Sequence, residues 1–132
     1  MKFLKCMGIL IFLLLLSCQK NNWPLDEMPE ILTAESGMWT MNEFEKGYKV
    51  YIKMQNVPEE AEIKAIVINK RKYERFQLPI YDGNTVEIIT ALTTESKMIQ
   101  NFEPPKPDNR PDGIVFEIEG KEYFYEIKFE LI

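Results

Sequence analysis

The last twenty residues of the chain, 113–132, read GIVFEIEGKEYFYEIKFELI and decide the fold class. Large apolar side chains stand at every second position on both sides of Glu119-Gly120: Ile114, Phe116, Ile118, then Tyr123, Tyr125, Ile127, Phe129 and Leu131. Charged side chains fill the opposite face of the second run, at Glu122, Glu126, Lys128 and Glu130, with Phe124 as the exception. A period of two is typical of half-buried strands, so the segment predicts a hairpin turning at Glu119-Gly120. A one-residue slip would expose five large side chains, so the register is strongly fixed.

The same alternation runs through residues 48–54. Further strands are expected at residues 31–34, 38–41, 63–68, 73–80 and 86–92. Residues 65–68 are apolar without alternation, which indicates a central strand covered on both faces. Turns are expected at the polar residues 69–72 and at Asp82-Gly83. With about seven or eight short strands and no long helical period after the N-terminus, the sequence predicts an all-β, antiparallel sandwich.

The order of three of these strands resembles the B, C and C′ strands of bacterial immunoglobulin-like domains. It consists of residues 48–54, a turn containing Pro58, residues 63–68, a polar turn, and residues 73–78. The resemblance covers residues 30–132 and implies an immunoglobulin-like sandwich. A small meander β-barrel is the alternative, and the difference matters because a barrel can hold a ligand.

The N-terminus differs from the rest of the chain. Lys2 and Lys5 precede an apolar run over residues 6–16, which is about half of the ~20 residues that a membrane-spanning helix needs. Basic residues, a short apolar stretch and a small residue before a processing point are typical of a secretory signal. Residues 1–17 are therefore expected to be a signal helix that lies outside the fold.

The residues Leu15-Leu16-Ser17-Cys18 resemble the lipobox of bacterial lipoproteins. The resemblance implies cleavage between Ser17 and Cys18, and a diacylglycerol anchor on the Cys18 thiol that makes the membrane a partner. An uncleaved anchor, or Cys18 as an ordinary thiol, remains the alternative. Gln19 is not the Asp that is associated with inner-membrane retention in this family. The outer membrane facing the periplasm is therefore the favoured location, with the cell surface as the alternative.

Composition excludes several classes of chemistry. The chain has 132 residues, a formal net charge of −5, two Cys and no His. Cys6 leaves with the signal and Cys18 is consumed by lipid, so thiol catalysis and disulfides are excluded. The mature chain holds 14 basic and 21 acidic residues, or −7, which argues against nucleic acid as a partner. Without His, triad hydrolases and His-ligated zinc sites are excluded, and no cofactor or metal is expected.

The mature chain divides into a tether and one domain. Residues 18–29 are expected to be the lipidated Cys and a flexible tether, because they are polar and interrupted by Pro24 and Pro29. Residues 30–132 are long enough for a single β-sandwich domain. Trp23 in the tether has two interpretations: it rests at the lipid interface, or it folds back onto the domain.

A proline-rich segment between two strands is the first candidate binding site. The candidate loop consists of Pro104, Pro105, Pro107, Asp108, Asn109, Arg110, Pro111 and Asp112. Proline reduces the entropy that a loop loses on binding, which favours recognition. The alternative is a stiff connection that crosses between sheets. Asp108, Asn109 and Asp112 offer oxygen ligands that suit calcium, but these residue types are equally typical of turns.

The second candidate is a basic turn on an acidic protein, formed by Lys70, Arg71, Lys72 and Arg75. Such a cluster attracts anionic lipid head groups or a glycan, whereas the simpler interpretation is a solvated turn that protects a sheet edge. Tyr51 and Phe124 stand on otherwise polar strand faces. They mark either a partner surface or positions covered by loops or by the Trp23 region.

Together these features predict a lipid-anchored, non-catalytic module of the cell envelope that binds or scaffolds an envelope protein or a glycan. One alternative is a small-ligand carrier barrel, with an internal cavity lined by Ile63, Val67 and Ile127. The other is a carboxylate-based enzyme, which requires two acidic side chains that converge in a pocket.

Overall fold

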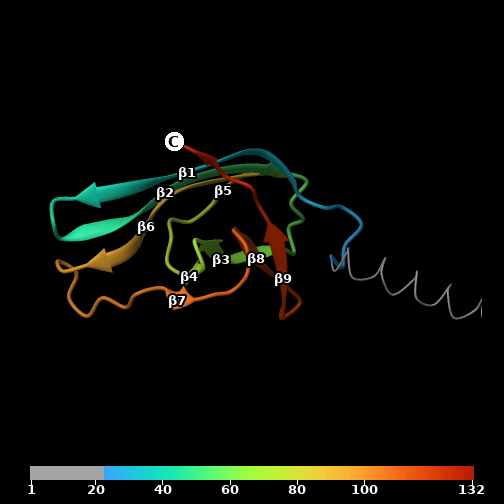
Figure 1. The fold of residues 1–132 in the computed structure, drawn as a ribbon. Helices are drawn as coiled ribbons and strands as arrows, with labels where there is room; N and C mark the ends of the chain where they lie inside the picture. Colours follow the sequence, from blue (N-terminus) through green and yellow to red (C-terminus); the bar gives the residue numbers. More distant parts are fainter. Residues whose placement is uncertain (1–22) are drawn as a thin grey trace, which may run out of the picture.

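The computed structural model describes residues 23–132, which fold into two β-sheets (Figure 1). In the first sheet the strands lie in the order β10 (Glu130–Leu131), β1 (Glu30–Met41), β2 (Glu45–Gln55), β6 (Thr85–Ser96), β5 (Ile80–Asp82). In the second sheet the order is β7 (Lys106–Pro107), β4 (Arg71–Tyr73), β3 (Glu62–Ile68), β8 (Gly113–Ile118), β9 (Lys121–Glu126). Residues 23–132 contain no helix that is long and apolar enough to cross a bilayer.

The strand order is that of an immunoglobulin-like sandwich. The runs β1-β2-β6-β5 and β4-β3-β8-β9 correspond to strands A-B-E-D and C′-C-F-G of that architecture. The predicted fold class is therefore confirmed. The barrel alternative is wrong, because each sheet has two edge strands and does not close on itself. Ten strands form in residues 23–132, more than the predicted number, because β4, β5, β7 and β10 have only two or three residues each. One pair, β1 with β10, is parallel.

The alternating segments form the predicted strands, and tight turns join them. The hairpin of β8 and β9 turns at Glu119-Gly120, where both residues have a positive φ, as the two-residue turns that suit the strand twist require. Asn69-Lys70 joins β3 to β4 in the same way, with φ of 51° and 63°. Residues 31–34 and 38–41, expected as two strands, are one strand, β1, with an irregularity between Ile31 and Thr33.

Two predicted strands are wrong at their ends because the chain changes sheets there. The strand expected at 73–80 ends at Tyr73, and residues 74–79 cross to the first sheet, where β5 begins after Pro79. Phe76 packs against the core during this crossing. The return strand expected to reach Leu131 ends at Glu126. The chain then crosses to pair with β1, and Leu131 is 88% exposed there.

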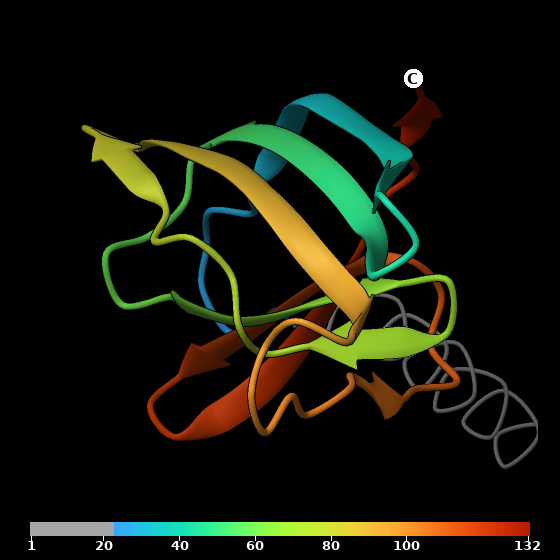
Figure 2. The same cartoon turned by 90° about the vertical axis from the view of Figure 1, so that its left-hand side faces the viewer.

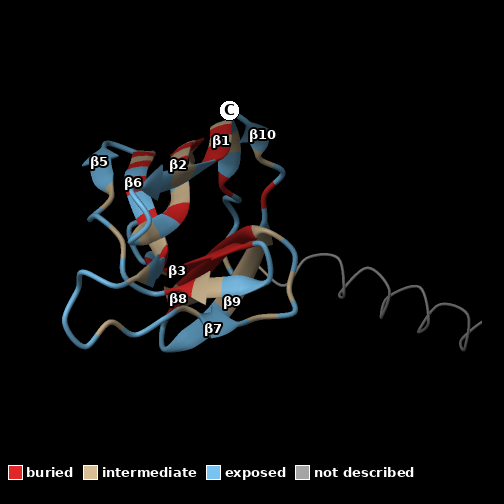
Figure 3. Cartoon of the chain, turned by 60° about the vertical axis from the view of Figure 1, so that its left-hand side comes forward, coloured by how far each residue is buried: buried red, intermediate tan, exposed pale blue. Residues whose placement is uncertain are grey.

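The main core lies between the sheets, where the buried strand faces meet (Figure 3). Its fully buried side chains include Ile52, Met54, Ile66, Ile88, Leu92, Ile114 and Phe116. Trp23 folds back onto this core, with its ring 5.2 Å from that of Phe116 and 6.2 Å from that of Tyr123. The Trp23 indole donates a 2.6 Å hydrogen bond to the Glu27 carbonyl. Residues 23–29, expected in the tether, therefore include side chains that pack on the domain.

A second, smaller core lies on the outer face of the second sheet. Ala65, Val67 and Val115 are buried there, with Phe124 packed against them. The Arg110 guanidinium stands 5.0 Å from the centre of the Phe124 ring. The prediction that residues 65–68 are covered on both faces is confirmed, and Phe124 is covered by the proline-rich loop.

Candidate functional site

The proline-rich loop and the basic turn, separate candidates in the sequence, meet in the structure. Asp108 N–H donates to the Lys70 carbonyl at 2.9 Å, and Asn69 N–H donates to an Asp112 carboxylate oxygen at 2.9 Å. The Lys70 ammonium donates to the Asn109 carbonyl at 3.0 Å. The two candidates therefore form one surface, which we call the loop–turn surface and define as residues 69–72 and 106–112.

The loop crosses between the sheets, from the end of β6 to the start of β8. On its way β7 pairs with β4, so that Pro107 lies beside Arg71 and Lys106 beside Lys72. Proline is tolerated here because β7 is an edge strand with no further neighbour in its sheet. The loop therefore runs as the simpler interpretation expected, as a connection that crosses between the two sheets.

A tight ion pair fixes the loop over the second sheet. The Arg110 Nη2 atom lies 2.7 Å from Asp108 Oδ2, and Arg110 Nε donates to the same carboxylate. The Arg110 side-chain hydrogen bonds, aided by its backbone N–H and positive charge, lower the pKa of Asp108 to about 2 against the opposing effect of burial. Both oxygens of Asp108 are occupied by this partner, which leaves them poorly placed for a cation. Residues 23–132 hold no group of three or more His, Cys, Asp or Glu side chains that could bind a metal.

The predicted basic turn is a turn only at Lys70, because Arg71 and Lys72 belong to β4 and Arg75 follows that strand. Two of its cations are neutralised by acids: Lys72 lies 3.3 Å from Glu74, and Arg75 lies 3.6 Å from Glu103. Lys106 lies opposite another cation, Lys72, and forms no ion pair within residues 23–132. The positive charge of this region is therefore smaller than the sequence suggests.

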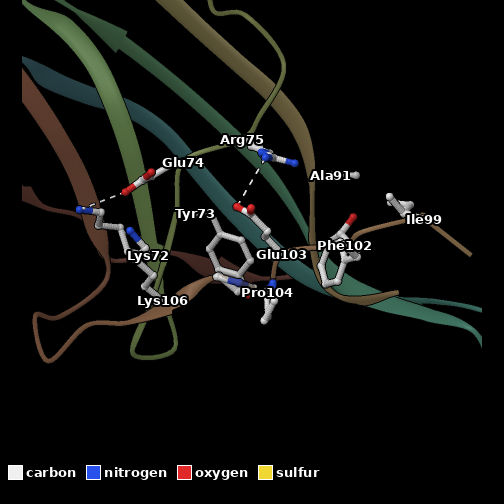
Figure 4. Close-up of a pocket in the computed structure, with 12 residues that line it drawn as sticks. Lys72, Tyr73, Glu74, Arg75, Ala91, Ile99, Phe102, Glu103, Pro104 and Lys106 are labelled. Atoms are coloured by element: carbon white, nitrogen blue, oxygen red, sulfur yellow. Dashed lines mark ion pairs between the residues drawn. The ribbon is translucent and has the colours of Figure 1, made fainter. Parts of the chain in front are cut away.

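A groove of about 210 Å³ lies between the end of β4 and the loop that follows β6 (Figure 4). Tyr73, Ala91, Thr93, Ile99, Phe102 and Pro104 supply much of its lining. The Arg75–Glu103 ion pair bridges its two sides, and each of these side chains is 80% exposed. Beside the groove the buried Tyr73 hydroxyl shares a 2.7 Å hydrogen bond with the Thr94 hydroxyl. Burial raises the pKa of Tyr73 above its usual value.

Sequence reasoning missed this groove. Its apolar residues Ile99 and Phe102 follow β6, in a stretch that carried no strand pattern. Its floor comes from β6 residues that were expected only as part of a strand. One feature of the sequence could have indicated the groove: residues Ile88 to Thr94 include no charged residue.

The cavity expected for a ligand carrier does not form between its three predicted residues. Ile63 and Ile127 pack within the main core, where they are 7% and 3% exposed. Val67 is buried in the separate cluster on the outer face of the second sheet. The pockets found among residues 23–132 open at the surface instead.

Comparisons with models of protein families, with curated proteins and with solved structures found no match for this chain.

Proposed function

We propose that the protein is a lipid-anchored, non-catalytic binding module of the bacterial cell envelope. The observation that carries the proposal is the position of the lipobox Leu15-Leu16-Ser17-Cys18 just before a packed domain. Lipidation at Cys18 leaves four residues before Trp23, which contacts the core. Five Cα–Cα steps span at most about 18 Å. The anchor would thus hold the domain close to the bilayer, and the lipobox itself lies outside the described residues.

The position of the loop–turn surface supports binding as the role. β8 starts at Gly113 beside this surface and ends at Ile118, near the point where Trp23 packs on Phe116. A strand of six residues is about 20 Å long. In Figure 1 residues 23–29, in blue, lie at the right of the sandwich, and β4 and β7 of the loop–turn surface lie to their left. A partner in the envelope, whether a protein or a glycan, would bind this surface without competing with the contacts of Trp23.

The acidic residues around the groove also favour binding over acid–base chemistry. Glu74 and Glu103 both line the groove, yet each lies within 4 Å of a cation, Lys72 or Arg75. A glycosidase-like pair needs two carboxyl groups that act on the substrate as acid and base, whereas both of these carboxylates are engaged in ion pairs.

Metabolic labelling with palmitate tests the anchor. We expect the wild-type protein and Cys6→Ala to be labelled and to sediment with membranes, because Cys6 lies in the signal. Cys18→Ala should lose both the label and the membrane association. Label that persists in Cys18→Ala, or an unlabelled wild-type protein, would refute lipidation.

Crosslinking in the native envelope tests the binding role. We expect a reproducible partner for the wild-type protein, and its loss when the exposed cations of the loop–turn surface are reversed in Arg71→Glu/Lys106→Glu. The matched control is Lys121→Glu, an equally exposed lysine at the turn between β8 and β9. Equal recovery with all three proteins would show that the loop–turn surface is not the binding site.

A further inference from the structure

We propose that the open edge of β6 binds an extended segment of a partner polypeptide, which adds to the first sheet as a further strand. This inference rests on the binding role proposed above and adds to it a second site, next to the loop–turn surface, with a class of partner for that site. It does not depend on lipidation.

The main chain of β6 is unpaired along most of one side. β5 pairs only with the first three residues of β6, up to Glu87. Within residues 23–132, no backbone hydrogen bond reaches Ile88–Ser96 from any strand except β2. The crossing segment donates from Gln77 N–H to the Thr90 hydroxyl, not to the β6 main chain. Figure 2 shows β6, in gold, with β2, in green, along one side; past the end of β5 the other side has no strand, and the connection from β4 to β5 passes near it. Such an edge presents free N–H and C=O groups for a new strand.

The sequence of this edge suits strand pairing. Residues 88–94 read IITALTT and contain no charge, proline or glycine. Uncharged segments with high β-propensity pair readily with other strands, and proteins normally protect them.

Four other edge strands of residues 23–132, β10, β5, β7 and β9, carry such protection. β10, β5 and β7 have two or three residues each, and β7 contains Pro107. β9 has exposed charges at both ends, and residues 23–29 border it: Tyr125 donates to the Pro29 carbonyl and Trp23 packs on Tyr123. β1 is also open on one side, because β10 pairs only with Glu35 and Ser36, and residues 37–41 carry no charge. Of these two long open edges, only β6 contributes residues to the groove between β4 and the loop that follows β6.

The groove beside this edge indicates what occupies it. Its volume of about 210 Å³ is below the ~300–1,000 Å³ that is typical of small-molecule sites. Ala91, Ile99 and Phe102 offer apolar contacts for one side chain of an added strand (Figure 4). The Arg75–Glu103 bridge is exposed, so its opening costs little.

Shape and charge restrict the partner further. The edge is recessed between residues 72–75 and 99–106, which favours a narrow extended segment over a second folded copy. Three cations and two carboxylates line the groove, and both carboxylates are paired with cations. Lys106 is left without an acidic partner in the described part of the chain. The geometry points to an extended peptide with an apolar side chain followed by an acidic one.

The probe for the test is a phage-displayed library of random eight-residue peptides, with the full mature protein in detergent micelles as bait. We expect enrichment of peptides with alternating apolar residues and a carboxylate. Synthetic copies of these should slow hydrogen exchange of those amides in residues 88–94 that face the open edge.

The variant Ile99→Glu places a charge in the groove and should weaken peptide binding at least tenfold. The matched control is Met98→Glu, because Met98 is 65% exposed on the same loop and does not line the groove. No enrichment, binding without protection of residues 88–94, or equal affinity for both variants would overturn the strand site. So would a stable dimer in which these amides are protected without peptide. Failure of envelope crosslinking alone would instead contradict the binding role in the envelope and leave the strand site standing.

Discussion

Arg110 joins the loop to the second sheet through two contacts of different kinds. Its guanidinium binds both oxygens of Asp108, and it also stands over the Phe124 ring. The Asp108 side chain is only 11% exposed, so the pair is more shielded than a surface ion pair. Charge-assisted hydrogen bonds of this geometry are stronger than neutral ones. Arg110 therefore packs on Phe124, which in turn packs against the buried Val67 and Val115 cluster.

We expect Arg110→Ala to lower the free energy of unfolding by about 1–2 kcal/mol at neutral pH, because it removes the ion pair and the contact with Phe124. The control is Arg75→Ala, which breaks a pair whose side chains are 80% exposed. Its effect should stay within about 0.5 kcal/mol. Urea denaturation followed by circular dichroism measures both values, and equal effects would contradict a structural role for Arg110.

The same pair gives stability a dependence on acid pH. The pKa of Asp108 is about 2 in the folded protein, below its ordinary value of 3.8. A carboxyl with a lowered folded pKa contributes stability that is fully present above the ordinary value and is lost as the pH falls toward about 2. The difference between wild type and Arg110→Ala should therefore narrow between about pH 4 and pH 2. A constant difference across this range would assign the effect of Arg110 to packing alone.

At the level of single residues, the sequence identified Asp108 and Arg110 as members of a candidate loop but not as partners of each other. Turn-forming residues two positions apart are usually solvated, and nothing in the sequence brings Phe124 beneath Arg110. That contact depends on the register of β8 and β9, in which Val115 lies opposite Phe124. Tyr51, the other aromatic exception, lies opposite the half-exposed Ile89.

At the level of elements, hydrophobic period predicted β2, β3, β6 and β8 but not the points where the chain changes sheets. An alternating strand has the same pattern in either sheet of a sandwich, so residues 73–80 and 123–131 each appeared to be one strand. The crossings depend on long-range contacts, such as the hydrogen bond from Ile127 N–H to the Asp112 carbonyl. For the same reason the groove was not predictable, because its lining comes from three separate segments.

The loop between the sheets is expected to be a structural element, so its removal should affect the whole fold. Deletion of residues 104–111 removes β7 and uncovers Ala65, Val67 and Val115 on the second sheet. We expect the free energy of unfolding to fall by on the order of 3 kcal/mol. Binding of a hydrophobic dye should rise. Pro111→Ala, which keeps the loop length at an exposed position, should change stability by less than about 1 kcal/mol. An unchanged unfolding midpoint in the deletion variant would show that the loop is only a connection.

At the level of the whole molecule, the first described residues close one end of the sandwich. Trp23 and Leu25 pack against the core, and the Tyr125 hydroxyl donates to the Pro29 carbonyl. A domain of about 100 residues has a stability of only about 5–15 kcal/mol, so a few such contacts form a large part of the total. The boundary at residue 30 that the strand pattern suggests therefore cuts through the packed domain.

Three soluble fragments that begin at residues 19, 23 and 30 test this boundary. The first two should unfold at the same urea concentration, because residues 19–22 precede the packed Trp23. The fragment that begins at residue 30 should be less stable by about 3 kcal/mol, since it loses the aromatic contacts of Trp23 and the bond from Tyr125. Tryptophan emission gives an independent measurement, because a Trp23 that packs on Phe116 should shift to longer wavelength on unfolding. Equal stability of all three fragments would mean that residues 23–29 act as a tether, and the anchor that we propose at Cys18 would then allow the domain a longer reach from the membrane.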